Sequence, residues 1–212
     1  MGRLTWIAIG LAGVFLATFA VGAATGFLQP AQVEAWMADL SARPTGKLLI
    51  AALVFALLAG DLVLAVPATP LMIAAGHELG PWLGGAVSAA GAMAAVVIGY
   101  GVCRVGGRPA FRRWVKPEEA ARARALFDRY GMLAVVLARG LPILPEVFAC
   151  LGGLVRLPSG RFLGAFAIAT VPWALLHTLA GHYSSFDNPW PALLILVGLP
   201  VAAWTVARRI GR

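Results

Sequence analysis

An arginine inside an apolar segment is the residue of this chain best suited to bind an anion. Arg139 lies within the apolar run 132–155, where a charge at bilayer depth costs roughly 3 kcal/mol or more and needs a partner. A guanidinium stays protonated and presents a planar fork that matches a phosphate group. Two partners fit: the phosphate of a ligand, or Glu146 in a structural ion pair. The two interpretations are compatible if a ligand and Glu146 compete for Arg139.

Asp61 is the other notable acid, because it also lies deep in an apolar run, residues 48–75. Desolvation favours the neutral form of a carboxylic acid, so Asp61 is suited to take up and release a proton. Glu146 is a second candidate for proton coupling. The alternative for Asp61 is a structural role, at a helix end or paired with an arginine.

A P-x-x-P motif interrupts each of the two apolar runs. Pro67 and Pro70 break the first run, and Pro142 and Pro145 break the second. Each motif predicts a turn followed by an outgoing half-helix, the first of which Thr69 can cap. Non-helical backbone at membrane depth must be buried in protein or line a hydrated cavity, and helix N-termini facing such a place favour an anion. The four prolines and Thr69 are therefore candidate substrate-binding residues.

The composition indicates that this chain is embedded in a lipid bilayer. Of its 212 residues, 60% are hydrophobic and 12% are charged, whereas a soluble domain carries about 25% charged residues. The net charge of +8 does not indicate nucleic acid, because eight of the 17 Lys/Arg residues lie between Arg104 and Arg129, flanked by apolar segments. Basic clusters beside membrane spans are typical of cytoplasmic loops that meet anionic lipids.

We expect no metal, no cofactor and no enzymatic activity. Cys103 and Cys150 are far apart in the sequence and lie in apolar stretches, so we expect neither a disulfide nor a metal site. His177 and His182 have a poor spacing for a shared metal on one helix face, which favours core or interfacial roles. The sequence contains no Walker loop, no H-E-x-x-H and no G-x-S-x-G motif.

The elements that position these residues follow from the apolar segments and their breaks. We interpret the N-terminal apolar segment as an uncleaved span, although it could also be a signal peptide. The next helix is amphipathic and lies either on the membrane surface or against loops of the protein. The expected elements are a first transmembrane helix (1–28), an interfacial amphipathic helix (29–47), a broken segment (48–80), a span (82–105), a basic amphipathic cytoplasmic segment (106–130), a second broken segment (131–157), a span (160–181) and a last transmembrane helix with a basic tail (190–212).

The distribution of positive charge distinguishes two topologies for the broken segments. If both segments return to the side from which they enter, 14 Lys/Arg residues lie inside and two outside, with Arg139 in the membrane. If both cross the membrane, the best distribution is 10 inside and six outside. The positive-inside rule favours two re-entrant hairpins, the first entering from outside and the second from inside, with both termini cytoplasmic.

The expected fold is therefore an all-α membrane protein with an inverted repeat. Two re-entrant helical hairpins are each followed by a transmembrane helix, and one extra span lies at each end. Inverted repeats whose broken helices meet near the midplane are a transporter architecture.

Two motif sets resemble the DedA / SNARE-associated Golgi protein (VTT domain) superfamily, and the Golgi-type branch more than the DedA proteins. The resemblance covers residues 48–183, which we interpret as a VTT-type domain. The second half carries the more specific set: Tyr130-Gly131, Leu137-Ala138-Arg139-x-x-Pro142-x-x-Pro145, Gly152, Pro158-x-x-Arg161-Phe162, Pro172 and Gly181. The first half carries Val66-Pro67-x-x-Pro70, Ala75-Gly76, Gly80-Pro81, Gly91 and Arg104-x-x-Gly107-Arg108.

This resemblance implies re-entrant hairpins and lipid translocation, either phospholipid scrambling or the return of undecaprenyl phosphate. By motif position, Asp61 matches the family's first-hairpin acid and Arg139 its second-hairpin arginine. Thr69 stands where DedA proteins carry a second acid, and Pro145–Glu146 where they carry another arginine. The implied partners are anionic membrane lipids and a proton or sodium ion, with a homo-oligomer possible, in a bacterial inner membrane. The alternatives are an ion or small-solute transporter on the same fold and a non-transporting scaffold for membrane-protein biogenesis.

Overall fold

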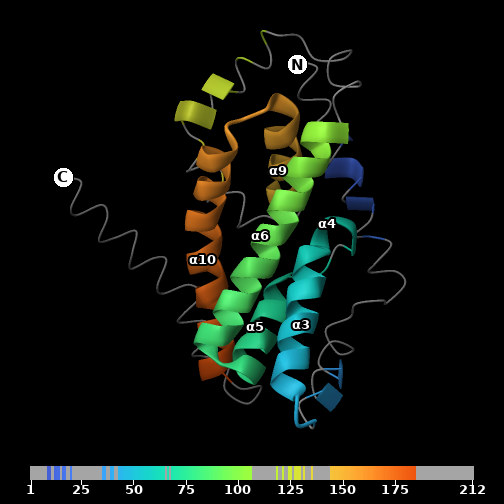
Figure 1. Ribbon diagram of the computed structural model, residues 1–212, viewed down its shortest axis with the longest axis vertical. Coiled ribbons are helices and arrows are strands. Elements are labelled where there is room, and N and C mark those ends of the chain that lie inside the picture. The colour runs from blue at the N-terminus through green and yellow to red at the C-terminus, as the bar shows by residue number, and fades with distance from the viewer. Residues whose placement is uncertain are drawn as a thin grey trace, which may run out of the picture. The chain divides into compact units, whose positions relative to one another are not determined.

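The structure is a computed structural model (Figure 1) that describes residues 43–64, 66, 68–106 and 144–184, with scattered positions between 9 and 40 and between 118 and 135. The elements within these ranges are helices, and no strand occurs among the described residues. The all-α class is thus confirmed for this part of the chain. The last predicted span (190–212) lies outside it, and only isolated helical positions of the first span are described.

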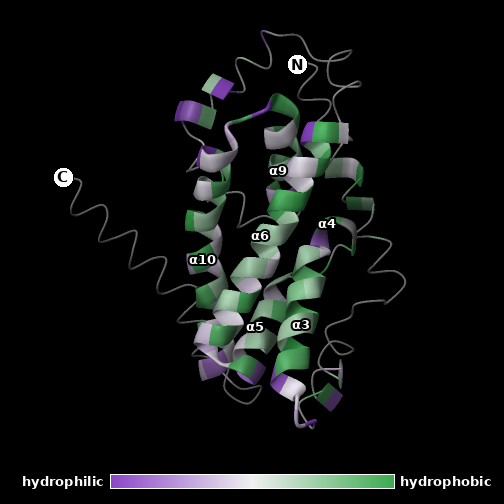
Figure 2. Cartoon of the chain, viewed as in Figure 1, coloured by the Kyte–Doolittle hydropathy of each residue, from purple (hydrophilic) through white to green (hydrophobic). Residues whose placement is uncertain are grey.

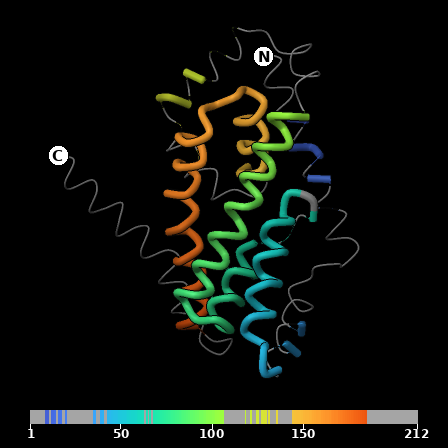
Figure 3. The backbone as a smooth tube through the Cα atoms, viewed as in Figure 1, coloured from blue at the N-terminus to red at the C-terminus, as the bar shows by residue number. Residues whose placement is uncertain are grey.

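The first broken segment forms three helices in place of one span. Helix α3 (Gly46–Ala59) is followed by a turn at Gly60, the short helix α4 (Asp61–Leu64) and helix α5 (Ala68–Leu79). The predicted interruptions at Gly60–Asp61 and at the first P-x-x-P motif are therefore confirmed, and the backbone path shows both (Figure 3). Gly80 ends α5 with a φ of 79°, which suits glycine because it lacks a Cβ atom.

Two long helices follow the half-helices of the two segments. Helix α6 (Pro81–Gly106) begins on a proline, which fits the first helical position because no N–H is needed there. Helix α9 (Leu144–Val155) begins within the second P-x-x-P motif, and helix α10 (Ser159–Tyr183) continues through Pro172.

The helix lengths separate spans from half-helices. Helices α6 and α10 have 26 and 25 residues, are apolar enough to cross a membrane, and extend about 39 and 37 Å at 1.5 Å per residue. Helices α3 and α9 have 14 and 12 residues, or about 21 and 18 Å, which is shorter than a hydrocarbon core of about 30 Å.

The long helices consist largely of hydrophobic residues (Figure 2), and some of their apolar side chains are exposed. Trp82 and Val105 of α6 and Ile168 of α10 expose 73%, 75% and 62% of their surface. Such side chains would be costly in water and are ordinary against lipid, so their exposure agrees with the composition.

The helices are divided between two compact units. The first unit takes in Ala56–Val66 and Ala90–Thr170, together with Met1–Gln29. Its core is aromatic: Phe162 and Phe166 are fully buried, and Phe162 packs on Tyr100 and Phe127 with ring centroids 5.3 and 5.4 Å apart. Phe127 of the basic amphipathic segment thus packs against this core.

The second unit, which takes in Pro30–Phe55, Pro67–Ala89 and Val171–Arg212, is held by close backbone contact between helices. A Cβ atom added at Gly76 of α5 would lie 2.0 Å from the carbonyl oxygen of Thr178 in α10. A Cβ atom at Gly181 would lie 1.9 Å from the carbonyl oxygen of Ile73. Small residues therefore let α5 and α10 touch, as is usual within membranes.

The same set of contacts recurs in the first unit. Tyr100 is the twentieth residue of α6, as Thr178 is of α10. A Cβ atom at Gly153 of α9 would lie 2.2 Å from the Tyr100 carbonyl oxygen. The Tyr100 hydroxyl donates to the Leu157 carbonyl (2.7 Å), and the Thr178 hydroxyl donates to the Pro81 carbonyl (3.1 Å). In each unit, the twentieth residue of a long helix thus contacts a half-helix through its carbonyl and bonds through its hydroxyl to the chain just after that half-helix.

Candidate functional site

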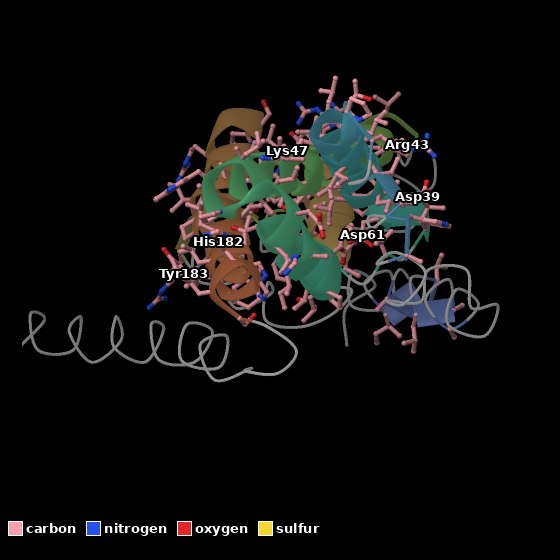
Figure 4. All side chains as sticks on the ribbon, turned by 90° about the horizontal axis from the view of Figure 1, so that it is seen from below. Asp39, Arg43, Lys47, Asp61, His182 and Tyr183 are labelled. Carbon is pink, nitrogen blue, oxygen red and sulfur yellow. The ribbon has the colours of Figure 1, made fainter. Side chains whose placement is uncertain are left out.

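The first broken segment places its candidate residues at two helix starts. Asp61 is partly buried and opens α4 (Figure 4). Thr69 and Pro70 are exposed and are the second and third residues of α5. Thr69 was predicted to cap this helix, but α5 begins one residue earlier, at Ala68. Proline is tolerated in this first turn because its N–H groups have no partner within the helix.

The second broken segment places an acid at the start of its outgoing half-helix. Pro145 and Glu146 are partly buried and are the second and third residues of α9. A carboxylate in the first turn is stabilised by the partial positive charge of the helix N-terminus. By contrast, the first turn of α5 contains no acid.

Arg139, Pro67 and Pro142 lie outside the described residues. The ion pair between Arg139 and Glu146 and the proton-coupling role of Asp61 accordingly stay predictions.

A second cluster of charged groups surrounds the turn between α9 and α10, which we call the α9–α10 corner (residues 155–159). Arg104 donates from Nη1 to the Leu157 carbonyl (3.3 Å) and to the Tyr100 hydroxyl, and its Cζ lies 5.4 Å from the centroid of the Tyr100 ring. Arg124 donates from Nε to the Val155 carbonyl (2.9 Å). Carbonyls at a helix C-terminus lack intrahelical partners and carry partial negative charge, so two guanidinium groups satisfy them well.

Arg156 lies between these two carbonyls in an unusual backbone conformation. The Arg156 N–H bonds to the Gly153 carbonyl (3.1 Å) and the Leu157 N–H to the Gly152 carbonyl (3.0 Å), a pair of bonds that ends a helix with one left-handed residue. That residue is Arg156, with a φ of 59°, and it alone among the described non-glycine residues has a positive φ. Gly80 has the corresponding place after α5.

The two cysteines, for which the sequence predicts no disulfide and no metal site, belong to neighbouring helices of the first unit. Cys150 of α9 is buried and its thiol lies 3.9 Å from the Gly99 carbonyl of α6, one turn before Cys103. Both are free thiols. His177 is buried in α10, donates from Nδ1 to the Trp173 carbonyl (2.8 Å) and packs at a tilt against the Trp173 ring, which confirms a core role. Within the described ranges, no three residues that could bind a metal lie together.

Comparison with known proteins agrees with the motifs. The sequence pattern of the VTT domain matches residues 66–183, more than half of the chain. The chain belongs to the VTT domain family. The matched range contains α5, α6, α9 and α10, and it begins after Asp61.

Undecaprenyl phosphate transporter A of Bacillus subtilis (strain 168) is similar to this VTT-domain protein. The two sequences are 27% identical over 110 residues, which make up 46% of this chain and 56% of the relative. The chain thus spans about half the length of the curated relative that it matches. No solved structure matches the chain.

Sequence reasoning did not identify the α9–α10 corner as a cluster. One signal was available: in Tyr100-x-x-x-Arg104 the two side chains are four residues apart on α6, which places them on one helix face. The contacts of Arg104 and Arg124 with a turn some 30 to 50 residues later depend on tertiary packing.

Proposed function

We propose that this VTT-domain protein moves an anionic lipid, a polyprenyl phosphate or a phospholipid, across the bilayer, as a transporter or scramblase and not as an enzyme. The observation that carries the proposal is the repeated construction of the two halves. Each half has a half-helix too short to span, a turn, and a long apolar helix, and each half-helix packs on the twentieth residue of the other long helix. Paired repeats with broken helices are typical of proteins that carry a substrate through the membrane.

The proposed topology has two re-entrant hairpins that enter from opposite faces. The lengths of α3 and α9 support it, because neither crosses a hydrocarbon core of about 30 Å alone. The predicted charge distribution of 14 inside and two outside supports it independently.

In this proposal Arg139 binds the lipid phosphate at the turn of the second hairpin, beside Pro142 and Pro145. The start of α5, with Thr69, Pro67 and Pro70, offers a helix N-terminus without an acid in its first turn. Asp61 and Glu146 are the groups that would couple transport to protons. The name of the Bacillus subtilis relative supports an undecaprenyl phosphate cargo.

The deciding experiment is reconstitution of the full chain into liposomes that carry reporters for each leaflet. Labelled polyprenyl phosphate, phosphatidic acid and phosphatidylcholine should exchange leaflets at different rates, with the phosphate monoesters fastest. Flux of small ions without lipid exchange would instead support a solute transporter. No exchange of either, with correct insertion, would support the scaffold alternative.

A further inference from the structure

The arginines of the α9–α10 corner differ in whether they have a counter-ion. Arg161, in the first turn of α10, pairs with Asp128 (3.0 Å). Arg104, Arg124 and Arg156 form no ion pair with any residue that the structure describes. Three guanidinium charges therefore lie around one turn without a carboxylate partner in this part of the chain.

Two of these side chains are fixed by the fold. Arg104 and Arg124 bind the carbonyls of Leu157 and Val155, which directly flank Arg156. Each uses a minority of its guanidinium N–H donors in these bonds, so the others are available to a ligand. Fixed guanidinium groups lose little freedom when they bind a phosphate.

The backbone at Arg156 is a second observation, independent of charge. A left-handed conformation disfavours any residue with a Cβ atom, and glycine is usual at this position of a helix end. Gly80 has the corresponding place after α5, with a φ of 79°. Unfavourable backbone conformations cluster at binding sites, and this one occurs between the two carbonyls that Arg104 and Arg124 bind.

The corner also lies at the right depth for a lipid headgroup. The span α6 ends at Gly106, and the span α10 begins at Ser159. The corner is therefore at one end of both spans, at the level where headgroup phosphates occur.

We propose that Arg104, Arg124 and Arg156 form a binding site for the phosphate group of a membrane lipid, separate from Arg139. This proposal deepens the proposed function and rests on it, since the site would collect phosphate lipids at the surface before they enter the hairpins. The chemistry recognised is a phosphate monoester, carried on a polyprenyl chain or on diacylglycerol.

The test uses Arg156→Gly in the full-length protein, with Arg161→Gln as a control that removes the same charge from the same corner. Native mass spectrometry in a neutral detergent measures binding of a polyprenyl monophosphate, of phosphatidic acid and of inorganic phosphate. Arg156→Gly should bind both lipids about tenfold more weakly while its Tm rises by about 2 to 4 °C as the backbone relaxes. Arg161→Gln should bind within about twofold of wild type.

Several results would overturn the site. They are unchanged lipid binding by Arg156→Gly, an equal loss in Arg161→Gln, or binding of inorganic phosphate as tight as that of the lipids. If Arg156→Gly folds poorly, Arg156→Asn removes the charge in a residue that tolerates the left-handed region, and the same criteria apply.

The transport assay separates this proposal from the function on which it rests. Arg139→Ala should lose transport and keep phosphate-lipid binding at the corner. Binding that depends on Arg156 in a protein that exchanges no lipid would disprove the proposed function and leave the site standing. Lipid exchange by a protein whose lipid binding does not depend on Arg156 would disprove the site and leave the proposed function standing.

Discussion

At the scale of single residues, the phosphate-binding proposal depends on the partner of Arg139. Glu146 lies in the first turn of α9, and a helix N-terminus generally favours a carboxylate in its first turn. Arg139→Lys should insert and fold but transport at least about tenfold more slowly, because an ammonium is a point charge where a phosphate fits a planar fork. Arg139→Ala should lose transport while still inserting. Rates in liposomes and Tm in detergent measure the two effects.

The charge-swapped variant, Arg139→Glu with Glu146→Arg, is the control for an ion pair. Loss of one member of a buried pair costs roughly 3–5 kcal/mol, so a structural pair would make either single change impair folding. Recovery of both folding and transport in the double variant would contradict the phosphate role. Recovery of folding alone would agree with it.

Asp61 makes a separate prediction about energy coupling. If its carboxyl binds the coupled proton, Asp61→Asn should abolish the dependence of transport on a pH gradient, because the amide cannot titrate. The protein should still fold, since the amide occupies nearly the same volume as the acid. Transport is followed in liposomes with an imposed gradient of either sign. If the transport rates of wild type and variant are the same under each gradient, Asp61 has a structural role and does not bind the coupled proton.

At the scale of elements, glycine contacts should determine stability. Gly153→Ala places a Cβ atom 2.2 Å from the Tyr100 carbonyl oxygen, so α9 must move away from α6, at a cost of at least about 1–3 kcal/mol. Gly164→Ala is the matched control, because nothing lies within 4 Å of its added Cβ atom and alanine favours the helix. Thermal unfolding should show a lower Tm for the first variant and an equal or higher Tm for the second.

The cysteine contact offers a chemical test of the same packing. Because the Cys150 thiol contacts the Gly99 carbonyl of α6, one turn before Cys103, mild oxidation with copper phenanthroline should join α6 to α9 through an intramolecular disulfide. Limited proteolysis between the helices, followed by a non-reducing gel, detects the bond. Fragments that separate without reductant would show that these two helices do not pack as described.

The sequence predicted the breaks and spans better than it predicted the contacts between them. Proline and glycine act locally, so the ends of α3 and α5 and the start of α6 could be inferred from Gly60, Gly80 and Pro81. The hydrogen bond from Tyr100 to Leu157 could not, because it joins residues 57 positions apart. Arg156 was unpredictable for another reason: its residue type gives no sign of a left-handed backbone.

At the scale of the whole molecule, the repeated contacts connect the fold to transport. Tyr100 and Thr178 have the same place in their helices, and each binds the turn after the other half's short helix. A duplicated unit that is inserted in opposite directions can present the same binding geometry to both membrane faces in turn. The VTT domain match covers both halves, so the repeat belongs to the part of the chain that defines the family.

The proposed opposite insertion of the two halves makes a prediction about accessibility. In a variant without Cys103 and Cys150, single cysteines at Gly46 and Gly80 should both react with a membrane-impermeant maleimide from outside. Single cysteines at Gly131 and Ser159 should react only from inside. The reason is that a re-entrant hairpin begins and ends on one face, whereas a span changes face. Labelling of intact cells and of inverted vesicles distinguishes the sides. If Gly46 and Gly80, or Gly131 and Ser159, label from opposite sides, that segment crosses the membrane and the inverted repeat is lost.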